Sequence, residues 1–259
     1  MSMPVVFVSH GSPTLPTDPC PAREFLAGLG ASLGRPSAIL AISAHWEAAP
    51  ATVSGTSHNA TIHDFYGFPR ELYDYTYPAP GDPRLAAAVA ERLTRAGIPC
   101  HLDSRRGLDH GAWIPLLLMY PQADIPVLQL SLLQGGSPEE HFKLGTALRG
   151  LDNENVLVMG SGSLTHNLQA LERLGLAAAE PQWVSEYADW MDKALRARRL
   201  ADLFAYRQNA PYAARNHPTE DHILPLFAAL GASPDGGTTE RLHTSATFGA
   251  LRMDAYAFR

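Results

Sequence analysis

Residues 4–9 (PVVFVS), which run directly into His10-Gly-Ser-Pro, decide the fold. The run is almost continuously apolar and rich in valine, without the polar alternation of a strand that has one face in water. This pattern is typical of a strand buried on both faces, as in parallel sheets that are covered by helices on each side. Because the run stops at a polar turn carrying a histidine, it also indicates where a functional site would lie.

Other segments extend this pattern along the chain. Three more nearly continuous apolar runs occur at residues 38–43 (AILAIS), 125–130 (IPVLQL) and 156–160 (VLVMG). Helical patterns fall between them or beyond the last of them, at residues 85–96, 113–120, 138–148, 183–203 and 219–230, and residues 245–258 are expected to return as a strand. Strands that alternate with helices predict an α/β fold with a largely parallel central sheet flanked by helices.

One segment departs from this alternation. Residues 61–83 are dense in His, Asp, Tyr, Gly and Pro and have no clear period. Long irregular loops inside compact domains are usually functional, so we predict an ordered loop or lid here. Since no repeat, low-complexity tract or linker divides the chain, residues 1–259 are expected to form a single domain.

The amino-acid composition limits the binding partners and the cellular compartment that are expected. The formal net charge is −6 and the charges are mixed along the chain, which argues against nucleic acid or an anionic membrane surface as partner. Cys20 and Cys100 stand alone and cannot form a thiolate metal cage, so we interpret them as inert thiols in a reducing compartment. The apolar run before His10 is too short for a signal peptide or a membrane span, and a cytoplasmic location is expected.

Histidines follow three of the predicted buried strands. His10 and His45 come directly after their runs, and His166 lies slightly further past its own. The carboxyl ends of parallel strands meet at one edge of a sheet, where ligand sites form, so these side chains are expected to converge. A single histidine in such a turn is more often a hydrogen-bonding loop residue, but for three together a metal site at this edge becomes an equal alternative.

Two further segments add candidates. Asp109 and His110 precede a predicted helix, where Asp109 would cap the helix or orient His110, and capping is the more common role. Thr219 is predicted to cap the helix of residues 219–230, which would place His222 in its first turn, either as a ligand or as half-buried packing beside Leu226. Four of the remaining histidines are interpreted as surface residues: His58, His101, His141 and His243. His217 lies close before His222, and its role is ambiguous.

Eight segments, taken together and in order, resemble the class III extradiol ring-cleavage dioxygenases, and within them the DODA-like (4,5-DOPA dioxygenase extradiol-like) branch. They span nearly the whole chain. The segments are His10-Gly-Ser-Pro, Ser-Ala-His45-Trp, Thr61-Ile-His63-Asp-Phe-Tyr-Gly-Phe-Pro69, Tyr77-Pro-Ala-Pro-Gly, Asp109-His110-Gly-Ala-Trp113, Tyr120-Pro-Gln-Ala-Asp-Ile-Pro-Val, Thr165-His166-Asn-Leu and Glu220-Asp-His222-Ile-Leu-Pro-Leu.

The resemblance implies roles for particular histidines. His10, His45 and His222 would bind one divalent metal, and His166 would be the catalytic acid–base residue or a fourth ligand when zinc is bound. His110 would contact the substrate and assist catalysis. Members of the wider superfamily use two histidines and a glutamate, whereas the third ligand here is an imidazole, as in the DODA-like branch. An all-imidazole site suits zinc as well as iron.

The lid is expected to contribute to substrate binding. His63 and Tyr66 are predicted to bind substrate together with His110, and the lid would close over the ring and exclude water. The aromatic rings of Phe65, Tyr66 and Phe68 suit a planar ligand, although packing within the lid is an equally common role for any one of them.

The resemblance implies a metal-dependent extradiol dioxygenase that opens the ring of a catechol-type substrate, DOPA-like or related, with O2. Fe(II) is the expected cofactor and Zn(II) a plausible bound species. The expected partners are a small aromatic diol and O2, with no nucleic acid and no membrane, and the oligomeric state is left open. The alternatives are a zinc-dependent hydrolase, because such a site can also activate water, and a non-catalytic metal-binding member.

Overall fold

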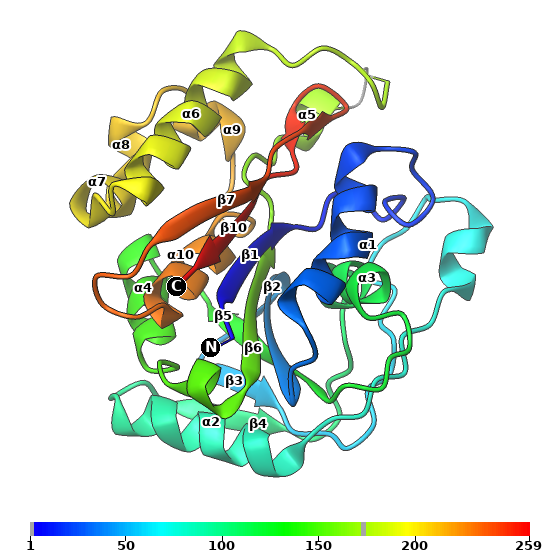
Figure 1. The fold of residues 1–259 in the computed structure, drawn as a ribbon, viewed down its shortest axis with the longest axis vertical. Helices are drawn as coiled ribbons and strands as arrows, with labels where there is room; N and C mark the ends of the chain where they lie inside the picture. Colours follow the sequence, from blue (N-terminus) through cyan, green and yellow to red (C-terminus); the bar gives the residue numbers. More distant parts are fainter. Residues whose placement is uncertain (1–2, 172–174) are drawn as a thin grey trace.

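The computed structural model describes residues 3–171 and 175–259. Its centre is a sheet with the strand order β4-β3-β5-β2-β6-β1-β10-β7 (Figure 1). The strands are β1 (Val5–Ser9), β2 (Ala38–Ala48), β3 (Ala51–Ser54), β4 (Cys100–Asp103), β5 (Val127–Leu133), β6 (Val156–Gly162), β7 (Thr239–His243) and β10 (Ala255–Phe258), and a separate hairpin pairs β8 (Ala246–Thr247) with β9 (Leu251–Arg252).

The middle of the sheet is parallel. β6 pairs in parallel with both β1 and β2, and β2 pairs in parallel with β5. Antiparallel pairs flank this centre, because β10 runs against β1 and β7, and β3 runs against β5. The predicted α/β class with a largely parallel sheet is confirmed. β3, β4 and β7 were not predicted, since all three are short and β4 and β7 are only partly buried.

Side chains of β1 show how both faces of the sheet are covered. Val5 and Phe7 belong to one apolar core, and Val6 and Val8 belong to the other. Such alternation buries every residue of the strand, and each fully buried valine or phenylalanine contributes about 1.5–3 kcal/mol relative to exposure. The continuous apolar run at residues 4–9 therefore reflects two cores rather than one.

Helices form the two outer layers (Figure 1). The core that contains Phe7 is covered by α2 (Pro83–Arg95), α4 (Pro138–Thr146), α6 (Gln182–Arg196) and α10 (Leu224–Ala232). The core that contains Val8 is covered by α1 (Pro21–Leu33) and α3 (His110–Met119). Shorter elements are η1 (Arg70–Asp74), η2 (Leu151–Glu154), α5 (Leu168–Leu171), α7 (Leu200–Phe204), α8 (Tyr206–Asn209) and α9 (Ala213–Asn216).

Helix starts follow ordinary capping chemistry. The Asp109 carboxylate accepts a hydrogen bond from the backbone N–H of Ala112 at 3.2 Å, which confirms the predicted capping role and starts α3 at His110. Ser137 and Glu140 form a reciprocal capping box at the start of α4. The histidine at position 110 is thereby fixed in the first turn of a buried helix.

Two predicted helices begin or end elsewhere. The helix expected over residues 183–203 is broken, because Arg198 takes a left-handed φ of 47° between α6 and α7. The helix expected over residues 219–230 starts only at Leu224, with Pro225 in its first turn, where a missing N–H costs nothing. Thr219 is therefore not its N-cap, and His222 lies in a turn before the helix rather than inside it.

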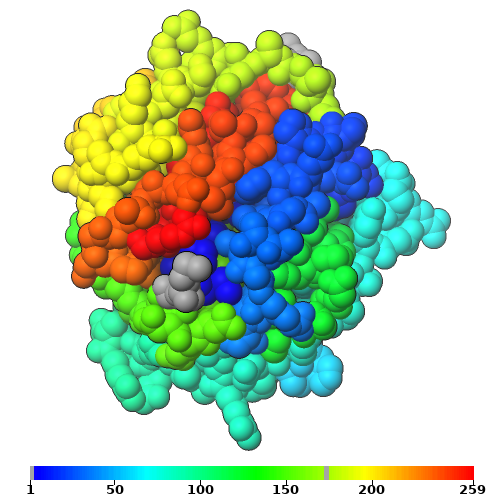
Figure 2. Space-filling model, in the orientation of Figure 1, coloured from blue at the N-terminus to red at the C-terminus, as the bar shows by residue number. Residues whose placement is uncertain are grey.

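The predicted lid is an ordered segment folded against the α3 side of the sheet. It is irregular except for η1, and it is anchored by the buried side chains of Phe65, Leu72 and Tyr77. Figure 2 shows the face on which the N-terminal part of the chain (blue) lies beside the C-terminal part (red and orange). Within the described ranges, every helix is too short or too polar to cross a membrane.

His141 corrects one expectation from the sequence. It was expected at the surface, but its side chain is fully buried in α4. Nδ1–H donates to the carbonyl of Ser137 at 2.9 Å, and Nε2 accepts from the N–H of Leu133 at 3.0 Å. Both nitrogens are satisfied only in the neutral ring, and burial lowers the pKa of His141. The polar residues around it in the sequence concealed this role.

This arrangement predicts a pH-dependent stability. Because the pKa of His141 is lower in the folded than in the unfolded protein, its contribution is complete above about pH 6.5 and is lost as the pH falls. Between pH 7 and pH 5, the free energy of unfolding should fall less in His141→Gln than in the wild type, by about 1 kcal/mol, because only the wild type gains a proton at this position on unfolding. Urea denaturation at each pH measures this.

His101→Gln is the matched control, since the side chain of His101 is exposed. Its stability should follow the wild type at every pH. Equal pH slopes for the wild type and His141→Gln would contradict the neutral-ring interpretation.

Candidate metal centre

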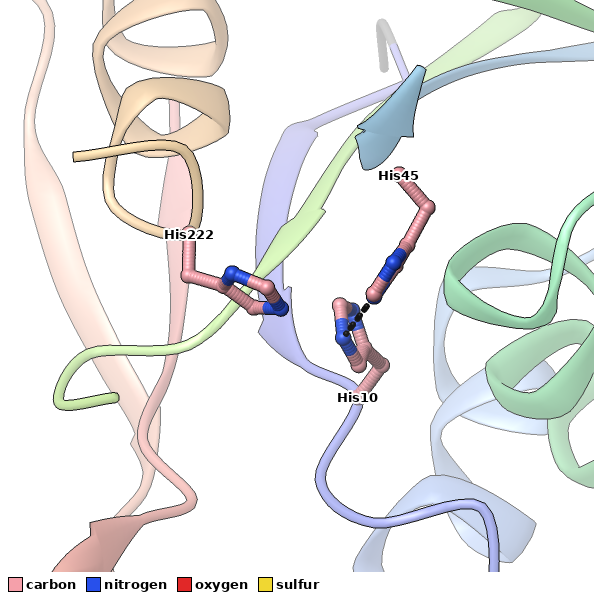
Figure 3. A group of neighbouring side chains, drawn as sticks. All are labelled: His10, His45 and His222. Carbon is pink, nitrogen blue, oxygen red and sulfur yellow. Dashed lines mark hydrogen bonds between the residues drawn. The ribbon is translucent and has the colours of Figure 1, made fainter. Parts of the chain in front are cut away.

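Three imidazoles converge at the carboxyl edge of the parallel strands (Figure 3). His10 follows β1, His45 lies on β2, and His222 lies in the turn before α10. One nitrogen from each ring lies within 4.8 Å of the other two. The Nε2 atoms of His10 and His45 are 3.1 Å apart. The structure thus brings together the three residues that the sequence proposed as metal ligands.

Backbone contacts place these side chains. The N–H of His10 donates to the carbonyl of Gly162 at 2.9 Å, which ties the end of β1 to β6. His45 was expected in a turn after its strand, but β2 continues to Ala48, and its register with β5 shifts between Ile42 and Glu47. Such an irregularity re-aims side chains near functional sites. His45 is therefore directed from within the strand.

Two glycines allow the close approach of the histidines. A Cβ on Gly162 would lie 2.1 Å from the carbonyl oxygen of His222, so only glycine lets the His222 turn rest on β6. A Cβ on Gly111 would lie 2.4 Å from Oγ of Ser43 and 2.9 Å from Cδ2 of His45. Neither glycine stands out in the sequence, because the close approach depends on distant segments.

Hydrogen bonds behind the rings select their tautomers. Ser161 donates its hydroxyl proton to the carbonyl of Gly111, so its oxygen accepts from Nδ1–H of His10 at 3.1 Å. Nδ1–H of His222 likewise donates to the carboxylate of Asp221. When Nδ1 carries the proton, the Nε2 lone pair is free to bind a metal. Both rings therefore direct Nε2 lone pairs into the shared space.

Burial keeps the cluster neutral. It lowers the pKa of His10 and His222 well below the usual value, and the neighbouring histidines lower it further. Burial, followed by the charge of His110, also lowers the pKa of His45 to about 4. Neutral imidazoles do not need to lose a proton before they bind a cation, so the site can bind metal at neutral pH.

The spacing of the nitrogens fits one cation. Nitrogen ligands lie about 2.0–2.1 Å from zinc, so two ligands at 90–110° stand about 2.9–3.4 Å apart. The measured 3.1 Å between His10 and His45 falls within this range. Three neutral nitrogens that face one point match the preference of zinc and Fe(II) for imidazole. The residues present therefore fit a divalent transition metal.

His166 and His110 flank the three imidazoles. The ring of His166 stacks on that of His222, with centroids 3.4 Å apart and planes within 7°. The ring of His110 lies 3.9 Å from that of His45. Asp64 accepts from Nδ1–H of His110 at 2.9 Å and lies 3.5 Å from Nδ1 of His45. Five histidines thus surround the same space.

Asp64 supplies the negative charge on the His110 side. Its partial burial acts to raise the pKa, but the hydrogen bonds and charge of His110 outweigh this and lower the pKa to about 2. The sequence placed Asp64 in the lid without a role. Its position in the sequence, next to His63, indicates a role in the site only once the structure shows that the lid contacts His110.

A cavity of about 730 Å³ opens over the five histidines. Tyr66 lines it from the rim, where 91% of its surface is exposed. His63 does not line it. Its Nε2–H donates to the carbonyl of Tyr75 at 3.0 Å, and its ring packs against Trp113. Of the predicted substrate-binding residues, His110 and Tyr66 face the cavity, and His63 lies inside the lid.

Comparison with known proteins agrees with this geometry. Residues 20–258 match the family described as the catalytic LigB subunit of aromatic ring-opening dioxygenase. The chain is 39% identical to 4,5-DOPA dioxygenase extradiol of Beta vulgaris, over 97% of this chain and 95% of the relative. It is 38% identical to 4,5-DOPA dioxygenase extradiol of Escherichia coli, over 89% of this chain and 85% of the relative.

The fold has a solved counterpart. A crystal structure of an uncharacterized protein from Escherichia coli K12 superposes with a TM-score of 0.82 at 31% identity, and the match covers 99% of this chain and all of that one. The matches to the family, the relatives and the solved structure each run over most of the chain. The chain is therefore a member of the LigB family of aromatic ring-opening dioxygenases and an extradiol enzyme of the 4,5-DOPA dioxygenase branch.

Proposed function

We propose that this enzyme opens the ring of a catechol-type substrate with O2, at one divalent metal held by His10, His45 and His222. The single observation that carries the proposal is the convergence of three neutral imidazoles under a cavity, with two more histidines beside them. Fe(II) is the proposed metal, and Zn(II) is a species that the same nitrogens can hold. The substrate is a small aromatic diol, as the names of the relatives suggest.

When bound, Fe(II) would hold the two diol oxygens in anionic form and pass electrons from the ring to O2. The protein supplies the remaining steps. His166, stacked on His222 and lining the cavity, accepts the proton that the diol loses as it binds. Its place beside the ligand nitrogens gives it direct access to the substrate oxygens, and with zinc it could serve as a fourth ligand.

His110 holds the opposite side of the site. Asp64 accepts from Nδ1–H of His110, which leaves the Nε2 atom for the substrate. A proton held there can be delivered as the ring opens to a semialdehyde acid. Because the backbone N–H of His110 also donates to Asp64, at 2.9 Å, the lid and α3 are fixed to each other at this point. His110 is thus proposed as a catalytic residue that also joins the lid to α3 through Asp64.

The lid excludes water from the ring. Phe65 and Phe68 line the cavity beside Tyr66, and these rings can cover a planar substrate. We propose that His63 acts on the substrate through the lid, since its bond to Tyr75 and its contact with Phe65 hold the segment in place.

The first prediction from the proposed function concerns the reaction itself. Protein loaded with Fe(II) under anaerobic conditions and then mixed with catechols should consume O2, and the ring-opened product should contain both atoms of isotopically labelled dioxygen. An oxygen electrode and mass spectrometry measure these. Zinc-loaded protein should consume none, because zinc has no redox chemistry. Absence of uptake with every catechol, or hydrolysis by the zinc form, would refute the proposal.

A second prediction separates the role of His166 from that of a ligand. His166→Gln should lower kcat by about 10²–10⁴-fold, the usual contribution of a positioned acid–base group. Its Fe(II) content should remain at the wild-type level, because His10, His45 and His222 are intact. Metal analysis and steady-state kinetics measure this. Loss of Fe(II) in the variant would instead assign His166 to the ligand set.

A third prediction tests the packing behind the ligands. Gly111→Ala should weaken metal binding by about 10–100-fold, as loss of outer contacts commonly does, because a Cβ would displace the His45 ring. Competition with a chromophoric chelator measures the affinity. Gly28→Ala is the matched control, since a Cβ on Gly28 meets nothing within 4 Å. Equal affinities in the two variants would contradict the proposed constraint.

A further inference from the structure

His166 lies in an irregular segment just after β6, and this segment rests on the one that carries His222. The backbone N–H of His166 donates to the carbonyl of Asn216 at 2.9 Å. The N–H of Ser163 donates to the carbonyl of His222 at 2.8 Å. Backbone bonds therefore join the two segments on either side of the stacked rings of His166 and His222.

His217, whose role the sequence left ambiguous, lies between these two segments. Its side chain is fully buried at the end of α9. Its Nε2–H donates to the carbonyl of Leu164 at 2.8 Å, and because a carbonyl can only accept, the proton of the ring lies on Nε2. Burial lowers the pKa of His217 to about 4, so the ring is neutral at neutral pH. His217 is thus a buried donor that bonds the chain two residues before His166.

The ring of His217 is itself held in place by its neighbours. The ring of Tyr187 on α6 lies with its centroid 5.6 Å from that of His217, and the ring of Tyr206 on α8 lies at 6.3 Å. Arg207 donates from Nη1 to the carbonyl of His217 at 2.9 Å. The Tyr206 hydroxyl donates to Glu220 at 2.8 Å. The helices from α6 to α9 therefore define the position of the His217 donor.

Other bonds hold the same segment from the opposite side. The N–H of Leu164 donates to Oγ of Ser9 at 3.2 Å, which ties it to β1. The Thr165 hydroxyl donates to the carbonyl of Ala250 at 2.9 Å, which ties it to the β8–β9 hairpin. Both side chains, Leu164 and Thr165, are fully buried. The peptide units that lead into His166 are therefore oriented from two sides, and His217 supplies the side-chain bond on the side of His222.

The placement of the His166 ring depends on this backbone. The described contacts of His166 are its backbone bond to Asn216 and its stack on His222, and its ring lines the cavity. A ring held in this way moves with the peptide units that precede it. An acid–base group must lie within hydrogen-bond reach of the proton that it takes, and a misplacement of about 1 Å can lower a rate on the order of 10²-fold.

We infer that His217 is a positioning residue of this enzyme: its Nε2–H holds the Leu164 carbonyl and thereby keeps the His166 ring stacked on His222 and directed into the cavity. The inference rests on the proposed function, in which His166 accepts the proton of the substrate. His217 does not line the cavity, so it acts on the reaction through His166. A buried residue of the α6–α9 layer is thus added to the residues on which the reaction depends.

Two amide variants test the bond to Leu164. The amide nitrogen of glutamine can reach the position of Nε2, whereas that of asparagine reaches only the position of Nδ1. With Fe(II)-loaded enzyme and a catechol, His217→Asn should lower kcat at least about tenfold, and His217→Gln should keep kcat within about threefold of the wild type. KM and Fe(II) content should stay at the wild-type level in both variants. Steady-state kinetics and metal analysis measure this.

Two results of this comparison would overturn the inference. One is a wild-type kcat in His217→Asn. The other is a loss of Fe(II) in that variant, which would mean that His217 acts on the ligand His222 rather than on His166. If His217→Asn does not fold, His217→Leu, which fills the site without a donor, replaces it in the same test.

A double variant separates positioning from a general structural role. If His217 acts through His166, adding His217→Asn to His166→Gln should lower the remaining kcat by less than about twofold, because the two substitutions remove the same contribution. A loss of the same size in both backgrounds would show that His217 affects the enzyme independently of His166, and would contradict the inference.

Crystal structures of the Fe(II)-loaded wild type, His217→Asn and His217→Gln, grown without oxygen, provide a measurement that does not depend on turnover. In His217→Asn the His166 ring should shift by about 1 Å or more relative to His222, while His10, His45 and His222 superpose. In His217→Gln it should stay stacked. An unmoved His166 ring in His217→Asn would refute the inference. If no catechol supports O2 uptake, the proposed function fails, and these structures still decide whether His217 places His166.

Discussion

The whole site depends on one constraint, namely that three neutral imidazoles must direct their Nε2 lone pairs to the same point. Lone pairs packed so closely in a buried space have no favourable partner except a proton or a cation, and burial lowers the pKa of each ring. The parallel strands bring the three rings together, since the carboxyl ends of such strands meet at one edge of the sheet. Ser161 and Asp221 orient two of these rings, because each accepts the Nδ1 proton of one of them.

Small and polar residues, rather than the apolar cores, position the histidines of the site. Gly162 and Gly111 make room for the His222 turn and the His45 ring, where any side chain would collide. Behind His45, the buried Asp109 accepts from Ser43 at 2.7 Å and from Gln129 at 2.6 Å, and so fixes the start of α3 to the neighbouring strands. The packed sheet thus holds the proposed metal ligands in fixed positions.

Much of this could be predicted from the sequence, because continuous apolar runs reveal doubly buried strands and histidines at their ends reveal the edge of the sheet. What could not be predicted depends on contacts between distant segments. Asp64 gains its role only when the lid reaches α3, and Gly111 only when it meets β2. His141 was mistaken for a surface residue because its polar neighbours in the sequence hide a buried ring. The helix at residues 219–230 began late because Pro225 suits a first turn.

The most direct test of this account is a crystal structure of the metal-loaded protein, with the metal located by anomalous scattering. The account predicts a single metal site, about 2.0–2.1 Å from the Nε2 atoms of His10, His45 and His222, with the Nδ1 atoms of His10 and His222 still bonded to Ser161 and Asp221. A metal held elsewhere, or one bound through Nδ1 or without one of these three rings, would contradict it.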